Sequence, residues 1–484
     1  MRTTRSGPDG RDKHAGRWFS TRSAASAGRL ALVASLALAS LSALPAPAEA
    51  ALPTTGVWRT DGYGTVLVLD EDGMQEYQTT SVSCLKGLTA HRSDTAGGSG
   101  VRYVDVDGDG FTVRASGHRG RASGHWDGSP GVRHLQRIDR LPPRCQDPDP
   151  PRGRVAAFDV FWQTLEENYP FFAAKGINWR AMHDRYRPTV HEGMSDADFF
   201  DTLRTMVAPL ADAHVTLDSD AGRFARIRPG TVLPSPDLDA RVRAHVERHD
   251  LGGRKLTPHA NGRIGYADLP GDLGYLRLSG FSGFSGENSF TANSAAFDKA
   301  LGAVFTKERT TRLRGLVIDV RINGGGSDEL GLRLAGRLTD RGYTAYAKRT
   351  RNDPRDAARF TRPQPQRVRP AEAPRFTGPV TVLTGGSTMS AGESFVQALI
   401  NRPAKTVRIG QSTQGVFSDV LERVMPNGWE FGLPNEEFVT RSGSTFDGSG
   451  IPPHVKEPVF TKEEFARGRD SAFRRALAVL TESG

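Results

Sequence analysis

The sequence predicts a multidomain α/β protein with a small N-terminal β domain, a helical module and a larger α/β core. Its 484 residues exceed the size of one ordinary compact domain, so two or three separate hydrophobic cores are expected. A hydrophobic fraction of 37% supports burial, while 25% charged residues exclude a protein with many membrane spans. Extended, then helical, then alternating segments follow one another along the chain, and this order defines the three parts.

The first part of the chain, residues 1–50, has the pattern of a secretory signal peptide. A basic stretch ending at Arg29 precedes an apolar run over residues 30–44, and Ala48-Glu49-Ala50 supplies a small-residue cleavage site. The apolar run is shorter than the roughly 20 residues that span a bilayer. We therefore expect a secreted or extracytoplasmic protein without a stable membrane anchor after cleavage. An uncleaved anchor is the alternative.

The charge balance argues against a nucleic-acid partner. The formal net charge is +9, and residues 1–50 carry seven of the basic and three of the acidic side chains. The remaining excess is small and shows no run of Lys and Arg interleaved with aromatic residues. We expect it to support solubility.

Residues 51–147 predict the small β domain. Short extended segments over 66–69, 101–104 and 111–113 are separated by Gly and Asp, and a proline-rich stretch follows the domain. Cys84 and Cys145 are the two cysteines of the chain. In an exported protein we expect them to form a disulfide, with two free buried thiols as the alternative. Their separation does not fit a zinc site.

Residues 152–218 predict the helical module. Apolar side chains recur at helical spacing over 155–169 and 195–210, and the module ends in a helix-to-strand switch that carries His214. The next segment, residues 219–264, is rich in Arg, Pro and Gly and shows no clear periodicity. We expect it to be an irregular linker.

Residues 265–484 predict the α/β core. Apolar strands are expected over residues 275–278, 316–320 and 380–383, and they alternate with helices expected over residues 295–305, 328–338 and 391–400. Strands that alternate with helices in this way imply a sheet that is buried on at least one face.

The strongest local signal for chemistry is a strand, a sharp polar turn and a helix, with Ser390 where the helix begins. A serine there can expose its hydroxyl, and the next backbone N–H, of Ala391, lies near the positive end of the helix dipole. The alternative is that Ser390 caps the helix and Glu393 completes a capping box.

A glycine loop and a histidine could complete such a site. Asn323-Gly324-Gly325-Gly326 follows a buried strand, and its backbone N–H groups could bind an anion. A phosphate site and a plain turn are the alternatives for this loop. His214 is a candidate base for a serine hydroxyl, because its ordinary pKa lies near neutral pH.

Seven segments carry a resemblance to a known family, and their common order makes it specific. They are residues 167–172, 210–214, 274–278, 319–326, 388–393, 410–415 and 450–453. In this order they resemble the tricorn-type and carboxyl-terminal-processing serine peptidases, family S41. The resemblance implies a core of the crotonase-like layered type.

The resemblance also implies roles for individual residues. Ser390 would be the nucleophile, and the oxyanion hole would use the N–H of Ala391 together with that of Gly324 or Gly325. One branch of the family has a lysine base at the position of Val416, which cannot take up a proton. The sequence therefore resembles the branch in which a histidine, here His214, is the base.

Two further features bear on that branch. Asp447 stands where the branch usually has a glutamate that helps to orient the site, and it is one methylene shorter. The segment before the core, residues 219–264, is too short for the PDZ domain that the processing branch commonly carries.

These observations predict an exported serine peptidase that acts on peptides or proteins through an acyl-enzyme on Ser390. The mechanism requires no metal and no organic cofactor. One alternative is a non-catalytic relative that binds a peptide or a small apolar ligand. Another is an enzyme of acyl thioesters, although nothing in the sequence marks a coenzyme A site.

Overall fold

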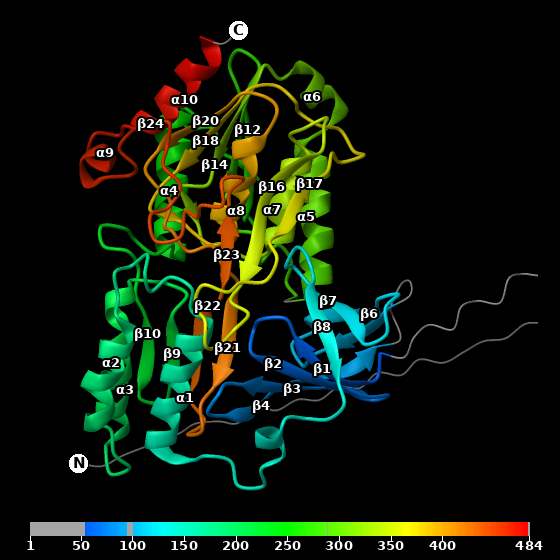
Figure 1. Cartoon of the computed structure of the whole chain (residues 1–484). Coiled ribbons are helices and arrows are strands. Elements are labelled where there is room, and N and C mark those ends of the chain that lie inside the picture. The colour runs from blue at the N-terminus through cyan, green and yellow to red at the C-terminus, as the bar shows by residue number, and fades with distance from the viewer. Residues whose placement is uncertain (1–53, 94–99, 288, 483–484) are drawn as a thin grey trace, which may run out of the picture. The chain divides into compact units, whose positions relative to one another are not determined.

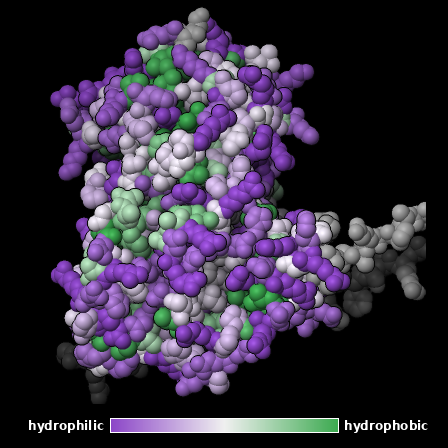
Figure 2. Space-filling view, in the orientation of Figure 1, coloured by the Kyte–Doolittle hydropathy of each residue, from purple (hydrophilic) through white to green (hydrophobic). Residues whose placement is uncertain are grey.

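The computed structural model describes residues 54–93, 100–287 and 289–482 of the chain (Figure 1). The expected signal peptide over residues 1–50 lies outside the described residues. Within the described ranges no helix is both long and apolar enough to cross a membrane. The face seen in Figure 2 is predominantly hydrophilic, with apolar side chains in small separate areas.

The N-terminal β domain is a closed barrel of eight antiparallel strands, in which β1 pairs with both β2 and β8. The strands are β1 (Gly56–Thr60), β2 (Thr65–Leu69), β3 (Gly73–Thr79), β4 (Cys84–Ser93), β5 (Val101–Val104), β6 (Gly110–Ala115), β7 (Arg121–Trp126) and β8 (Arg133–Ile138). Alternate side chains point inward and form one apolar core that includes Trp58, Tyr103 and Leu135. Closure pairs both edges of the sheet.

A disulfide joins Cys84 to Cys145. Cys84 begins β4, and Cys145 lies in the 3-10 helix η1 (Pro143–Gln146) that follows the barrel. The bond therefore ties the segment that leaves the barrel back to one of its strands. The predicted pairing of the two cysteines is confirmed.

Three helices, α1 (Gly153–Asn168), α2 (Trp179–Tyr186) and α3 (Asp196–Val207), pack on a four-stranded sheet with the order β10-β9-β22-β21. The strands are β9 (Thr216–Ser219), β10 (Gly222–Ala225), β21 (Val420–Val424) and β22 (Glu430–Pro434), and the 3-10 helices η2 (Arg187–Thr189) and η3 (Ala208–Leu210) follow α2 and α3. Two of the four strands thus come from the C-terminal part of the chain. The sequence predicts a contiguous module over 152–218, but β9 gains a partner on its second edge only from β22.

Residues 219–264 differ from the irregular linker that the sequence predicts. They contain β10, α4 (Pro236–His245), the π-helical turn η4 (Val246–Asp250) and β11 (Thr257–His259). Helix α4 begins after Ser235, whose side chain accepts a hydrogen bond from the N–H of Leu238. Since α4 itself buries only Val242 and His245, its sequence shows little apolar periodicity.

The core contains a seven-stranded sheet with the order β11-β12-β13-β14-β18-β20-β24. Its further strands are β12 (Ile264–Leu269), β13 (Leu273–Leu278), β14 (Gly315–Asp319), β18 (Val380–Thr384), β20 (Thr406–Gly410) and β24 (Val455–Lys456), and the run from β13 to β24 is parallel. Successive side chains of β14 face opposite layers: Leu316 and Ile318 lie in one apolar cluster and Val317 in another. The sheet is therefore buried on both faces.

Helices cover the two faces of this sheet. Helices α5 (Phe290–Val304), α7 (Asp328–Gly336) and α8 (Ala391–Ala398) contribute to one cluster, and α4 and α10 (Ser471–Thr481) contribute to the other. The remaining helices are α6 (Lys307–Arg312), the 3-10 helix η5 (Leu399–Asn401) and α9 (Lys462–Ala466). The expected alternation of strand and helix is present, and the protein is a mixed α/β protein with several cores.

Two smaller sheets complete the core. One has the order β17-β16-β23, from β16 (Tyr343–Thr350), β17 (Gln364–Val368) and β23 (Glu436–Val439). The other pairs β15 (Ile322–Asn323) in parallel with β19 (Ser387–Thr388). This second pair places the segment before the glycine loop beside the segment before Ser390.

Candidate active site

Ser390 occupies a strained turn between β19 and α8. Its backbone has φ 54° and ψ −127°, a conformation that non-glycine residues rarely adopt and that costs about 1–3 kcal/mol. The backbone N–H of Ser390 donates to the carbonyl of Val416 over 2.9 Å. Ser390 stands at the N-cap position of α8, but its side chain makes no capping hydrogen bond. The partly exposed hydroxyl is therefore not used as a cap.

Glu393 holds the neighbouring turn. Its side chain is fully buried, and its two carboxylate oxygens accept from the backbone N–H groups of Gly415 (2.7 Å) and Val416 (2.8 Å). Burial raises the pKa of Glu393 to about 7, against the opposing effect of these hydrogen bonds. Glu393 therefore attaches the turn at 415–416 to the first turn of α8. The same turn carries the carbonyl of Val416, which accepts from the N–H of Ser390, so Glu393 also fixes the position of this carbonyl.

Gly325 is the part of the glycine loop nearest Ser390. A Cβ atom on Gly325 would lie 2.5 Å from the Cβ and 2.9 Å from the Oγ of Ser390. Its φ of 84° also lies in the left-handed region that favours glycine. Two independent constraints thus require glycine at this position, and the loop approaches the serine as closely as backbone allows.

The candidate oxyanion donors differ in their present partners. The N–H of Gly324 donates to the carbonyl of Ser279 over 3.2 Å, and that of Gly325 donates to Oδ1 of Asn323 over 3.0 Å. The N–H of Ala391 lies in the first turn of α8, where no intrahelical acceptor exists. A substrate oxyanion would therefore meet Ala391 directly and would compete with internal acceptors for the glycine donors.

His214 lies in the turn between η3 and β9, and the fold brings this turn to the Ser390 segment. Ala213 packs in one apolar cluster with Met389 and Val416. Met389 precedes Ser390 in the sequence, and the carbonyl of Val416 accepts from the N–H of Ser390. Pairing of β9 with β22 supports the same arrangement, because β21 and β22 directly follow the 415–419 segment. The sequence neighbours of the predicted base and nucleophile thus pack together.

The ring of His214 is buried, and burial lowers its pKa from the ordinary value of 6.5. The charges of Asp212 and Asp419 and the backbone of Ser418 act in the opposite direction. Nδ1 of the ring has no hydrogen-bond partner in the part of the chain that the structure describes. Asp212 also holds the loop itself, since its Oδ1 accepts from the backbone N–H of His214 over 3.1 Å.

Asp447, the predicted orienting carboxylate, makes its hydrogen bonds elsewhere. Its Oδ1 accepts from the N–H of Phe417 over 3.3 Å, and its Oδ2 accepts from the hydroxyl of Thr445 over 2.5 Å. Burial raises the pKa of Asp447 well above its usual range. Asp447 is therefore a buried support of the 417 backbone, and within the described residues it makes no hydrogen bond with Nδ1 of His214.

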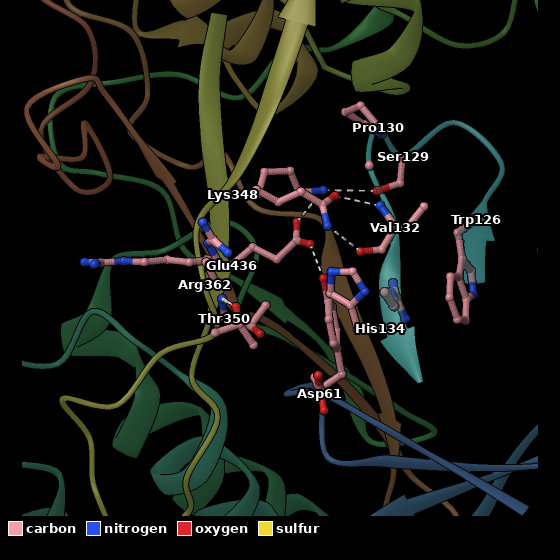
Figure 3. Close-up of a pocket in the computed structure, with 16 residues that line it drawn as sticks. Asp61, Trp126, Ser129, Pro130, Val132, His134, Lys348, Thr350, Arg362 and Glu436 are labelled. Carbon is pink, nitrogen blue, oxygen red and sulfur yellow. Dashed lines mark hydrogen bonds and ion pairs between the residues drawn. The ribbon is translucent and has the colours of Figure 1, made fainter. Parts of the chain in front are cut away.

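Sequence reasoning missed a charged group beside His214. Asp419 contributes to the electrostatic environment of the ring, and its Oδ2 accepts from Ser129 over 2.6 Å and lies 3.4 Å from Nζ of Lys348. Lys348 also pairs with Glu436 over 2.8 Å. Figure 3 shows Lys348 directed toward Ser129 and Glu436 in a pocket between the barrel and the core. A lysine on the same face of the strand as Tyr346, two residues earlier in β16, is the sequence signal that could have indicated this cluster.

A metal centre is not evident among the residues described. Within 54–93, 100–287 and 289–482, no group of three or more His, Cys, Asp or Glu side chains is arranged to hold a metal ion.

Comparisons with known proteins agree with the resemblance seen in the sequence. Residues 272–457 match the family model of peptidase family S41, and residues 150–208 match that of the tricorn protease C1 domain. A carboxy-terminal-processing protease of Bartonella bacilliformis is 28% identical over 192 residues, which are 39% of this chain. The same match spans 39% of the length of that relative.

Two solved structures share the fold over most of their length. A candidate peptidase from Parabacteroides merdae aligns with a TM-score of 0.58 and 25% identity, over 69% of this chain and 98% of that one. A mutant of CPAF aligns with a TM-score of 0.50 and 13% identity, over 69% of this chain and 98% of its own. The second is a likeness of fold alone.

Proposed function

We propose that the protein is an exported serine peptidase of family S41 that forms an acyl-enzyme on Ser390; the match of residues 272–457 to the model of that family supports the proposal. The observation that carries the proposal is the strained Ser390 turn, where an uncapped hydroxyl meets the glycine loop. A fold that maintains such strain at a serine while leaving the hydroxyl without a capping role is typical of a functional position.

In the proposed mechanism His214 removes the proton of the Ser390 hydroxyl, and Oγ attacks the carbonyl carbon of a peptide bond. The N–H of Ala391, together with that of Gly324 or Gly325, stabilises the oxyanion of the tetrahedral intermediate. The protonated His214 then donates its proton to the leaving amine, and water hydrolyses the acyl-enzyme. General-base assistance is worth about 10²–10⁴-fold and one oxyanion donor about 10²–10³-fold.

The environment of His214 supports its role as a base. A pKa lowered by burial keeps the imidazole neutral near pH 7, so that it can accept the serine proton. Asp447 is retained in the proposal as a residue that supports the site through the backbone of Phe417. The crotonase-like layering of the core stays a prediction from the family resemblance.

The decisive experiment is labelling of the purified protein with a fluorophosphonate probe, together with an assay of peptide cleavage. We expect labelling of wild type, loss of labelling in Ser390→Ala, and slower labelling and cleavage in His214→Ala. Ser387→Ala is the matched control, because Ser387 lies three residues earlier, in β19, and its hydroxyl donates to the carbonyl of Val232. Labelling that persisted in Ser390→Ala would refute the assignment of the nucleophile.

The alternative function is binding of a peptide or small apolar ligand without catalysis. A wild-type protein that bound peptides but neither reacted with the probe nor cleaved them would favour it.

We also propose export, which the Cys84–Cys145 disulfide supports, since such bonds persist in oxidising compartments. Cell fractionation and N-terminal sequencing of the mature protein test the location; a reduced protein that starts at Met1 in the cytosol would contradict it.

A further inference from the structure

A cluster of charged and polar side chains joins the barrel to the core beside His214. It consists of Tyr63, Ser129 and Arg133 from the barrel and Asp328, Lys348, Asp419 and Glu436 from the core. We refer to these seven residues as the interface cluster. All described residues belong to one compact unit, and the cluster lies on the contact between two of its parts. Figure 3 shows three of its members, Ser129, Lys348 and Glu436.

Lys348 is the centre of the interface cluster. Its side chain is buried, and its Nζ lies 2.8 Å from Oε2 of Glu436, 3.4 Å from Oδ2 of Asp419 and 3.1 Å from Oγ of Ser129. The barrel therefore contributes a direct ligand to a buried cation of the core. Ser129 has a second role, because its hydroxyl donates to Oδ2 of Asp419 over 2.6 Å.

Charge balance explains why these groups stay together. A buried charge without a partner costs several kcal/mol, so the carboxylates of Asp419 and Glu436 need nearby cations. Lys348 supplies one, and Arg133 supplies the other, with its guanidinium 4.2 Å from the ring centre of Tyr63. Burial raises the pKa of Asp328 well above its usual range.

One carboxylate oxygen of Asp419 makes no hydrogen bond with the other members of the interface cluster. Its Oδ2 is held by Ser129 and Lys348, whereas within the described residues no hydrogen bond reaches Oδ1. Asp419 is also partly exposed, unlike Lys348 and Glu436. On the other side, Nδ1 of His214 is a buried polar atom that the described residues leave without a partner.

The backbone that carries Asp419 is fixed next to His214. The hydroxyl of Ser418 accepts from the N–H groups of Asn435 (3.1 Å) and Glu436 (3.0 Å) and donates to the carbonyl of Asp419 over 2.6 Å. The ring of His214 interacts with the backbone of the same Ser418. The start of β23 thus holds both residues of the 418–419 segment against the histidine.

We propose that Asp419, held by Lys348 and by Ser129 of the barrel, is the positioning residue for His214, and that the barrel thereby forms part of the peptidase. The inference rests on the proposed function, in which His214 becomes an imidazolium after it takes the proton of Ser390. The negative charge of a carboxylate near the ring stabilises that cation. Asp212 has the larger effect on the pKa of the ring, but both of its oxygens have other partners. Its Oδ1 accepts from the backbone N–H of His214, and its Oδ2 accepts from the hydroxyl of Tyr169 and lies 3.3 Å from Nζ of Lys175.

The charges in this region define the expected sign. Asp212 and, to a smaller extent, Asp419 raise the pKa of His214, while Lys348 and Arg133 lower the pKa of Asp419, whose charge also acts on Asp328. Removing the charge of Asp419 should therefore lower the pKa of His214 further. Because a general base must be neutral, the acidic limb of the kcat/KM profile should move to lower pH by the same amount.

The test is the pKa of His214, measured by NMR of protein labelled with ¹³C-histidine and assigned with His214→Ala. We expect Asp419→Asn to lower this pKa by about 0.5–1 unit, to shift the acidic limb equally and to reduce kcat roughly tenfold. Asp419→Glu should restore part of each effect. An unchanged pKa and an unchanged limb in folded Asp419→Asn would overturn the proposal.

Two further variants separate positioning from stability. Ser129→Ala leaves every charge in place and should reduce kcat by about two- to fivefold, with a small shift of the limb in the same direction. Asp127→Asn breaks the ion pair of the barrel with Arg102 and should lower the melting temperature without moving the limb. If Asp419→Asn changed kcat and the acidic limb but Ser129→Ala changed neither, the claim that the barrel forms part of the peptidase would be wrong.

Failure of the proposed function is distinguishable from failure of this inference. If wild type does not react with the fluorophosphonate probe, the nucleophile assignment is wrong, whereas the pKa of His214 in Asp419→Asn still decides whether the two residues interact. If wild type reacts with the probe and Asp419→Asn does not change the pKa of His214, the assignment of Ser390 as the nucleophile is kept and the proposed role of Asp419 is wrong.

Discussion

The Ser390 turn and the interface cluster contribute to the same site in different ways. In the turn, backbone geometry dominates: the positive φ of Ser390, the close approach of Gly325 and the N–H groups at the start of α8 position the nucleophile. In the cluster, side-chain charges dominate, and one of its hydrogen bonds joins Ser129 to Asp419 across 290 residues. Backbone conformation thus sets the geometry of the nucleophile, while side chains from distant parts of the chain set the charge around the base.

The largest effect should come from filling the space between the glycine loop and the serine. In Gly325→Ala, the new methyl would lie 2.5 Å from the Cβ of Ser390 and would have to adopt a positive φ. We expect kcat/KM to fall by about 100-fold or more. Gly324→Ala is the matched variant, since the nearest atom to its Cβ is the Cβ of Pro234, at 3.9 Å. Equal losses in both would show that the turn does not depend on this approach.

Removal of the disulfide tests whether the barrel can lose stability without a change at the Ser390 turn. It joins residues 61 positions apart, for which loop-closure entropy predicts a contribution of about 4 kcal/mol. We expect the Cys84→Ser, Cys145→Ser double variant to lose up to about this free energy of unfolding in denaturant titrations. At temperatures where the variant is folded, probe labelling of Ser390 should persist. Loss of labelling in the folded variant would mean that the bond shapes the site directly.

The pH dependence of stability should identify Glu393 as a buried acid. Its pKa is raised to about 7 in the folded protein, against an ordinary value of 4.5. Its stabilising contribution is therefore fully present below about pH 4.5 and is lost as the pH rises through about 7. Relative to Glu393→Gln, wild type should lose about 3 kcal/mol between pH 4.5 and 8.

Glu393→Gln changes more than the charge. The amide would place an N–H donor against the N–H of Gly415 or Val416, so we expect this variant to be less stable at every pH. Thermal unfolding at a series of pH values measures both effects. A constant difference between wild type and variant over this range would show that Glu393 stays ionised when folded.

The smallest expected effect concerns the strain at Ser390. Glycine adopts φ near 54° without strain, whereas alanine does not, so Ser390→Gly should be more stable than Ser390→Ala by about 1 kcal/mol. Both variants lack the nucleophile and should not react with the probe. Chemical denaturation of the pair measures the difference. Equal stability would mean that the backbone of this turn relaxes when the serine is removed.

The local parts of the site could be predicted because their signals are close together in the sequence. The apolar runs and glycines predicted the strand, turn and helix around Ser390, and they predicted the loop at Gly324 and Gly325. The alternative role of Ser390 as a side-chain cap could be rejected only from the structure, which shows no capping hydrogen bond. Propensity alone does not distinguish a capping serine from a strained one.

The long-range parts could not be predicted in the same way. The elements within 219–264 are short and bury few side chains, so their periodicity is weak. The sheet around β9 is completed by β22, more than 200 residues later, and no local pattern specifies that pairing. The carboxylate beside His214 is a similar case: the family pattern indicated Asp447, but its hydrogen bonds go to Phe417 and Thr445.

The sequence by itself determined the disulfide partners, the alternation of strands and helices in the core, the glycine loop and the position of Ser390 at the start of a helix. These features follow from local propensity and spacing, which act between near neighbours in the chain. Tertiary structure decided the barrel closure, the strands that complete the sheet beside His214, and which carboxylates lie near its ring. These depend on burial and on polar and charge pairing between segments up to 373 residues apart, and such interactions exist only once the chain has folded.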